Sequence, residues 1–95
     1  MSTEPARDVL FPLGRTVITR GALDALDGEE VLAGIARHAR GDWGDICSED
    51  QQANDDALRV GTRLLSAFNT DGGQNFWIIT EADRSSTTVL LPEEY

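Results

Sequence analysis

The chain contains no lysine, only one cysteine and only one histidine. A lone cysteine cannot form an internal disulfide, and one cysteine with one histidine cannot complete a zinc site. No apolar run approaches the roughly 20 residues that a membrane-spanning helix needs. The first residues include Glu4 and Asp8 and lack the apolar stretch of a signal peptide. We therefore expect a cytoplasmic protein that carries no metal and no other cofactor.

Aromatic residues are also few, at 6% of the chain, although hydrophobic residues reach 40%. This composition is typical of a globular fold, and 95 residues suffice for one domain but not for two. Pro5 and Pro12 lie in an N-terminal stretch that has no hydrophobic periodicity. We predict a flexible tail over residues 1–12 and a single domain over residues 13–95.

Basic side chains are scarce as well, because eight arginines face 17 carboxylates and the formal net charge is −9. Proteins bind phosphate backbones mainly through lysine and arginine, and a surface with this net charge repels them. Direct nucleic-acid binding is therefore not expected. A basic protein partner, or a protein surface that normally holds DNA, fits this charge.

A first helix is predicted after Asp27. Asp27 and Glu30 have the spacing of a capping box, in which each side chain bonds to the other residue's backbone amide. One helical face then carries Val31, Leu32, Ile35, Ala36 and Ala39. The arginines near residue 40 and the glycine at position 41 are typical of a helix C-terminus. A shorter helical turn is predicted over residues 21–26.

A second helix is predicted from another capping box at residues 48–51, which read Ser-Glu-Asp-Gln. Its buried stripe is predicted to contain Ala53, Ala57, Val60 and Leu64. Gly61 either ends this helix or lies within it. Residues 63–69 also fit a strand that places Leu64, Ser66 and Phe68 on one face.

Strands are predicted where β-branched and aromatic residues gather, at residues 15–19, 76–80 and 87–91. Turns at residues 71–73 and 84–86 separate the C-terminal strands. We predict an α+β domain in which two amphipathic helices pack on a C-terminal three-stranded antiparallel meander, with a short N-terminal edge strand.

The segment between the two helices, residues 41–47, is the most distinctive in the chain. Gly41 and Gly44 bracket Trp43, with Asp42 and Asp45 beside it, and this pattern predicts a tight turn. Either Trp43 anchors a surface for a partner, or its indole fills the core while the aspartates cap nearby amides.

Six carboxylates and no basic side chain lie between residues 42 and 56: Asp42, Asp45, Glu49, Asp50, Asp55 and Asp56. They do not follow the spacing of a calcium-binding loop, so no metal site is predicted. They form either a solvated acidic face or a row of charges that imitates the phosphates of DNA in a basic groove.

His38 and Cys47 offer a base and a nucleophile, but neither lies in a catalytic motif, and the chain is predicted not to be an enzyme. Arg84 follows a strand end of mixed charge and is either part of a turn or a partner contact. The predicted partner-binding residues are Asp42, Trp43, Asp45, Glu49, Asp50, Asp55, Asp56 and Arg84.

Several segments together resemble a group of small bacterial proteins that are labelled plasmid-related or type I restriction methylation subunit. They are residues 17–23 (VITRGAL), 41–45 (GDWGD), 54–55 (ND), 63–67 (RLLSA), 77–85 (WIITEADRS) and 90–95 (LLPEEY). A DNA methyltransferase needs a cofactor-binding domain and a catalytic motif of the NPPY or DPPY type, and this chain has neither. The resemblance therefore implies a plasmid or mobile-element setting and supplies no activity.

Two hypotheses for function follow. The first is a non-enzymatic protein-interaction module, in its sharpest form an antagonist that imitates DNA toward a nucleic-acid-binding defence complex. The alternative is a sensor domain that binds a small ligand or nucleotide between its helices and sheet. Binding through charge weakens as salt rises, whereas a bound metabolite raises thermal stability. The sequence does not indicate an oligomeric state.

Overall fold

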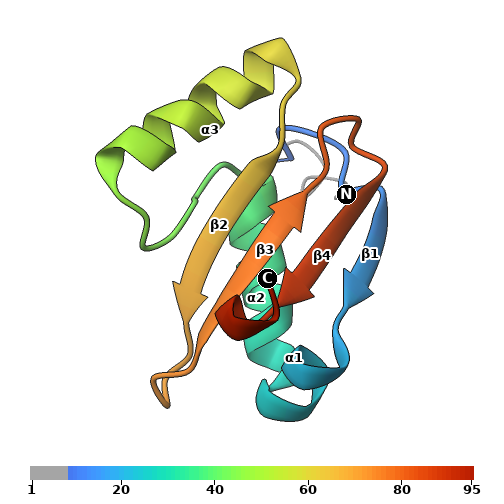
Figure 1. The fold of residues 1–95 in the computed structure, drawn as a ribbon, viewed down its shortest axis with the longest axis vertical. Coiled ribbons are helices and arrows are strands. Elements are labelled where there is room, and N and C mark those ends of the chain that lie inside the picture. Colours follow the sequence, from blue (N-terminus) through green and yellow to red (C-terminus); the bar gives the residue numbers. More distant parts are fainter. Residues whose placement is uncertain (1–8) are drawn as a thin grey trace, which may run out of the picture.

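The computed structural model describes residues 9–95, in which one strand is followed by three helices and then by three strands (Figure 1). In chain order they are β1 (Arg15–Ile18), α1 (Arg20–Ala25), α2 (Gly28–Ala39), α3 (Ser48–Val60), β2 (Leu64–Asn69), β3 (Asn75–Thr80), β4 (Ser86–Leu90) and the 3₁₀ helix η2 (Pro92–Glu94). Among the described residues, no helix combines the length and apolar character needed to cross a membrane.

The sheet of the described residues has four strands in the order β1-β4-β3-β2. The strands β2, β3 and β4 form the predicted antiparallel meander, with Ser66 opposite Ile78 and Ile78 opposite Val89. β1 is an edge strand as predicted, but it pairs with β4 in parallel, with Ile18 opposite Val89. The prediction gave the meander and the edge strand but not the mixed four-stranded sheet that they form, because the parallel pairing of distant segments leaves no local turn signal in the sequence.

The helices occupy two places around this sheet (Figure 1). α1 and α2 cover one face, and Val31 of α2 and Ala22 of α1 pack there with Phe76, Ile78 and other core side chains. α3 instead lies at one end of the sheet beside β2. The prediction that both amphipathic helices pack on the face of the meander was therefore wrong for the second helix.

α2 is rotated from the predicted orientation. Leu32 is 68% exposed and Ala36 is also exposed, whereas Gly34 and His38 face the sheet. A Cβ atom at Gly34 would lie 3.0 Å from the Phe76 ring, so the glycine allows the helix and the sheet to approach closely. The predicted apolar face is therefore correct at Val31 and Ala39 and wrong at Leu32 and Ala36.

The capping box of α2 forms only in part. The Asp27 carboxylate accepts a hydrogen bond from the Glu29 amide at 3.3 Å. The Glu30 carboxylate does not return to Asp27 but accepts the Asp71 amide in the β2–β3 turn at 2.8 Å. Glu30 therefore ties the start of α2 to a turn that is distant in sequence.

α3 begins without the predicted capping box. Cys47 occupies the N-cap position, and no side chain caps the helix there; Gln51 instead donates to the Ile46 carbonyl at 3.2 Å. Of the predicted stripe, only Ala57 is buried within the helix, together with Asn54, and Val60 is 66% exposed. Gly61 ends the helix with a left-handed φ of 80°, and the next residues form β2, so the strand interpretation of residues 63–69 is confirmed.

The predicted tail, residues 1–12, lies mostly outside the described residues. Its last part is ordered into the domain, because the Leu10 amide donates to the Ala39 carbonyl at 2.8 Å and Phe11 is buried. Phe11 and Leu64 belong to a second apolar cluster beneath α3. The packed part of the chain therefore starts before residue 13.

Candidate partner-binding surface

The connection between α2 and α3, residues 41–47, runs along the outer edge of β2. The Ala67 amide donates to the Trp43 carbonyl at 3.1 Å, and the Asp45 amide donates to the Ala67 carbonyl at 2.7 Å. Gly44 lies between them with a φ of 76°, and a side chain there would collide with the Ala67 carbonyl. Only glycine fits this position, which confirms the tight turn predicted from the sequence.

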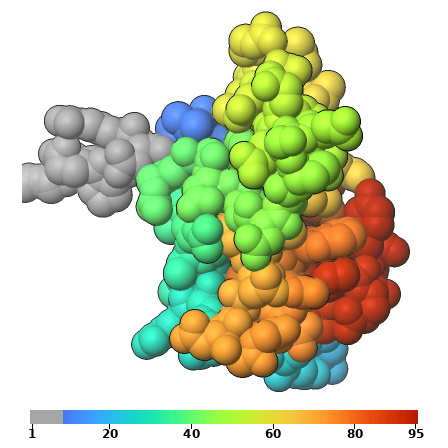
Figure 2. Space-filling model, turned by 90° about the vertical axis from the view of Figure 1, so that its left-hand side faces the viewer, coloured from blue at the N-terminus to red at the C-terminus, as the bar shows by residue number. Residues whose placement is uncertain are grey.

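Asn54 of α3 covers the backbone of Leu65, two residues before Ala67 at the same edge of β2. Its side-chain amide donates to the Leu65 carbonyl at 2.7 Å, and its carbonyl accepts the Leu65 amide at 3.1 Å. The connection and α3 together form the side of the molecule next to β2, seen from green to yellow in Figure 2 above the orange β2–β3 hairpin. The edge of β2 is thus occupied by the protein's own groups.

Replacing Asn54 with leucine is expected to destabilise the protein by about 2–3 kcal/mol, because the Leu65 amide and carbonyl lose their partners at a site that water reaches poorly. Urea denaturation measures the loss. Gln52→Leu is the matched control, since Gln52 is exposed on the same helix. Equal stability of the two variants would show that the edge contacts of Asn54 contribute little.

Trp43 fills the space behind the connection. Its side chain is 4% exposed, stacks on Phe11 with a centroid distance of 6.2 Å, and meets the His38 ring edge-on. The indole N–H donates to the Asp55 carboxylate at 3.1 Å. The structure therefore corrects the prediction that the Trp43 side chain contacts a partner, because the indole belongs to the interior.

The six carboxylates between residues 42 and 56 remain together around the connection and α3, and we call them the acidic rim. Its members are Asp42, Asp45, Glu49, Asp50, Asp55 and Asp56. Most are exposed, and Asp56 is half-buried. They come from two neighbouring elements, the connection and α3.

Two members of the acidic rim are neutralised by arginines. The Asp42 carboxylate pairs with Arg37 at 2.7 Å, and the hydrogen bond from Arg37 lowers the pKa of Asp42 below its usual value. Asp56 pairs with Arg59 at 3.0 Å. Both pairs are partly exposed, so each contributes little to stability.

The other four carboxylates form no ion pair within the described part of the chain. Asp45 accepts from the neutral amide of Asn69 at 2.7 Å, and Asp55 accepts from the Trp43 indole. Glu49 and Asp50 are exposed in the first turn of α3, where negative charge is favourable. These four residues form the uncompensated part of the acidic rim.

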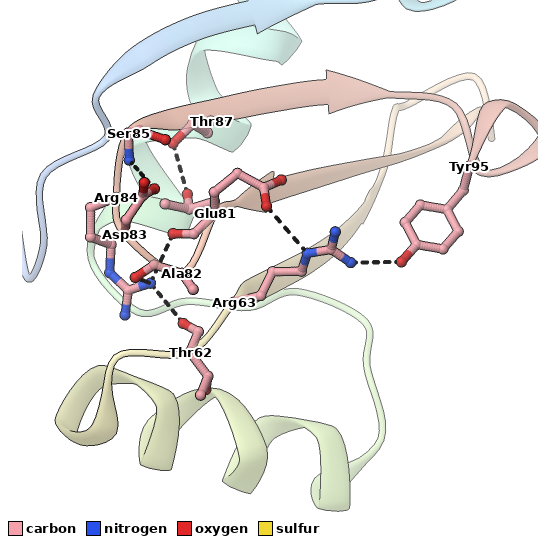
Figure 3. Close-up of polar contacts among 10 residues, drawn as sticks. Thr62, Arg63, Glu81, Ala82, Asp83, Arg84, Ser85, Thr87 and Tyr95 are labelled. Atoms are coloured by element: carbon pink, nitrogen blue, oxygen red, sulfur yellow. Dashed lines mark hydrogen bonds and ion pairs between the residues drawn. The ribbon is translucent and has the colours of Figure 1, made fainter.

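Arg84 holds the C-terminal end of α3 to the β3–β4 turn (Figure 3). Its guanidinium donates to the carbonyls of Thr62 at 2.7 Å, Ala57 at 3.0 Å and Glu81 at 3.1 Å. The residue has a left-handed φ of 61°, which directs the backbone around the turn. Of the two sequence interpretations, these contacts fit turn chemistry, and most donors of Arg84 are already used within the fold.

His38 is the centre of a buried chain of hydrogen bonds that the sequence did not reveal. Its Nδ1 lies 2.6 Å from the Ser66 hydroxyl, and its Nε2 lies 2.8 Å from the Thr80 hydroxyl. Thr80 contacts Thr87 at 2.7 Å, and the Thr87 hydroxyl donates to the Leu13 carbonyl at 2.7 Å. This chain joins α2, all three strands of the meander and the N-terminal segment.

The direction of most bonds in this chain follows from its last acceptor. Thr87 donates its single proton to the Leu13 carbonyl, so Thr80 must donate to Thr87. Thr80 then has no proton for His38, so Nε2 must donate to Thr80. Burial, and after it the charge of Arg84, lowers the pKa of His38 to about 4, so the ring is neutral near pH 7. A neutral ring with its proton on Nε2 accepts from the Ser66 hydroxyl at Nδ1.

The pair of His38 and Cys47 considered from the sequence is not formed. Both ring nitrogens of His38 are used by Ser66 and Thr80, and Cys47 is exposed. Within residues 9–95, no group of three His, Cys, Asp or Glu side chains gathers where it could hold a metal ion. The described residues therefore offer two distinct features, the exposed acidic rim and the buried hydrogen-bond chain around His38.

Comparison with protein-family models, with curated proteins and with solved structures gives no match for this chain. The resemblance to small plasmid-related proteins therefore stays a prediction.

Proposed function

We propose that this chain is a non-enzymatic protein-interaction module that binds a basic surface of a partner through the acidic rim. The observation that carries this proposal is the uncompensated charge of Asp45, Glu49, Asp50 and Asp55 on two neighbouring elements. Charges of one sign that lie close together speed encounter with an oppositely charged partner.

The way the acidic rim is held supports recognition of a partner with a fixed shape. Asp45 and Asp55 are positioned by hydrogen bonds to Asn69 and Trp43, and the connection is fixed to β2 through Ala67. Side chains that are already ordered lose less conformational entropy on binding. These contacts support a surface that presents Asp45 and Asp55 at set positions.

A surface of set carboxylates fits a groove that normally holds the phosphates of DNA. Such a groove is lined by lysine and arginine and binds largely through charge. We propose that the partner is a nucleic-acid-binding protein of a defence complex and that the chain blocks its DNA-binding groove. On this proposal, duplex DNA and the chain compete for the same surface.

Neutralising the acidic rim is expected to abolish partner binding while the fold is kept. The variant Asp45→Asn, Glu49→Gln, Asp50→Asn and Asp55→Asn keeps the size of each side chain and one acceptor oxygen at each position, but removes four charges. The immobilised chain should retain host proteins that are released by rising salt and by short duplex DNA, and the variant should retain none of them.

The control variant removes the same number of charges elsewhere, at Asp24, Asp71, Asp83 and Glu93, which are all exposed. It is expected to bind like the native chain. Equal loss in both variants would indicate that only net charge matters. Retention that neither salt nor DNA reverses would overturn the proposal that the chain imitates DNA.

A further inference from the structure

The rotation of α2 leaves an exposed stripe on its outer surface. The stripe contains Glu29, Leu32, Ala36 and Arg40, spaced by three, four and four residues, so that they follow one side of the helix. A negative charge lies at its N-terminal end and a positive charge at its C-terminal end. Neither Glu29 nor Arg40 forms an ion pair with another of residues 9–95.

Leu32 stands between two apolar hollows on this surface. One hollow is lined by Val9, Leu13, Leu32, Ile35, Ala36, Ala39 and the aliphatic part of Arg40. The other lies toward α1, where Leu23 is 59% exposed. The exposed Leu32 side chain projects beside a hollow that is lined by Ala36 and Ala39. The surface therefore carries both a projecting side chain and a recess that could receive one.

We propose that this stripe is the interface between two copies of the chain, packed through antiparallel α2 helices about a two-fold axis near Gly34 and Ile35. A two-fold axis brings each residue of one copy against its counterpart in the reverse order. Leu32 of each copy then enters the hollow around Ala36 of the other copy.

The charges of the stripe favour a second copy over another occupant. With the axis that pairs Leu32 with Ala36, Glu29 lies opposite Ala39 of the second copy, one residue from Arg40, so the long side chains of Glu29 and Arg40 can pair, and the same pair forms again on the other side. A parallel arrangement would instead bring like charges together. The acidic rim contributes no residue to the stripe, so two chains can meet here without bringing the acidic rims into contact.

Sedimentation velocity across the micromolar range tests the interface. The native chain is expected to form a dimer, and Leu32→Glu is expected to weaken the dimer at least about tenfold, because it places a charge in an apolar hollow. Val60→Glu is the matched control, since Val60 is exposed to a similar extent but lies on α3. A native chain that stays monomeric, or a dimer that Leu32→Glu does not weaken, would overturn the proposal.

A charge exchange tests the antiparallel register separately from apolar contact. Glu29→Arg alone and Arg40→Glu alone should each weaken the dimer, because each places two like charges opposite one another. The double variant should recover most of the native affinity. Single variants that dimerise as well as the native chain would show that the helices do not pair in this register, and circular dichroism confirms that each variant is folded.

Discussion

The free energy of unfolding is expected to fall by about 2 kcal/mol between pH 7.5 and pH 5, through the titration of His38 alone. The unfolded chain binds a proton at this histidine near pH 6.5, but the folded chain binds it only near pH 4. Between these values the unfolded state takes up more protons, so acidification favours unfolding. The stability that neutral His38 contributes is complete above pH 6.5 and is lost as the pH falls toward 4.

Urea denaturation at several pH values measures this slope, and nuclear magnetic resonance gives the pKa directly because His38 is the only histidine of the chain. His38→Gln is the control: it lacks the titrating ring and should show a flat profile over the same range, at lower stability. An equal slope in both proteins would contradict the assignment.

Replacing Trp43 with alanine is expected to cost about 3–5 kcal/mol, because it opens a cavity in the cluster beneath α3 and leaves Asp55 without the indole donor. A domain of this size has a total stability of about 5–15 kcal/mol, so the variant approaches the limit of folding. Thermal and urea denaturation measure the effect, and Trp43→Phe should recover most of the packing.

Trp77→Ala provides the comparison for Trp43→Ala. Trp77 is half-buried on the opposite face of the sheet and contacts the Tyr95 ring at a centroid distance of 5.5 Å. Its loss should be clearly smaller, since solvent already reaches part of the side chain. If the two substitutions cost the same, the indole of Trp43 would not be the main support of the α2–α3 connection.

The sequence was informative wherever a local signal determines the structure. The caps and glycines around α2, the turn at Asp71, and the alternation from Leu64 to Phe68 gave the elements and their order correctly. These signals act within a few residues, so they survive in any tertiary context. The α+β class and the antiparallel meander follow from them.

The orientation of the two longer helices could not be obtained in the same way. Hydrophobic periodicity placed Leu32 on the buried face of α2 and did not include His38 there. His38 is nevertheless buried, and the hydroxyl groups of Ser66 and Thr80 satisfy its two ring nitrogens. Likewise Asn54 is buried because it pairs with the backbone of β2. Hydrophobic periodicity alone predicts that a polar side chain is exposed. Its buried hydrogen-bond partners lie on strands that are distant in sequence, so they are identified only once the pairing of those strands is known.

The acidic rim was identified from composition, and its division into neutralised and uncompensated members required the structure. Arg37 and Arg59 lie on either side of the acidic stretch and form ion pairs with Asp42 and Asp56. The roles of Trp43 and Arg84 likewise depended on burial and on carbonyl groups that are remote in sequence. Which residues remain available to a partner is therefore a property of the fold.

The groups that cover the edge of β2 also bear on how this protein would aggregate. Few apolar side chains secure α3, and its release would leave the Leu65 amide and carbonyl without partners at the edge of the sheet. Such an edge templates the addition of strands from other molecules. We therefore expect partial opening at α3 to precede loss of the main core and to favour aggregation.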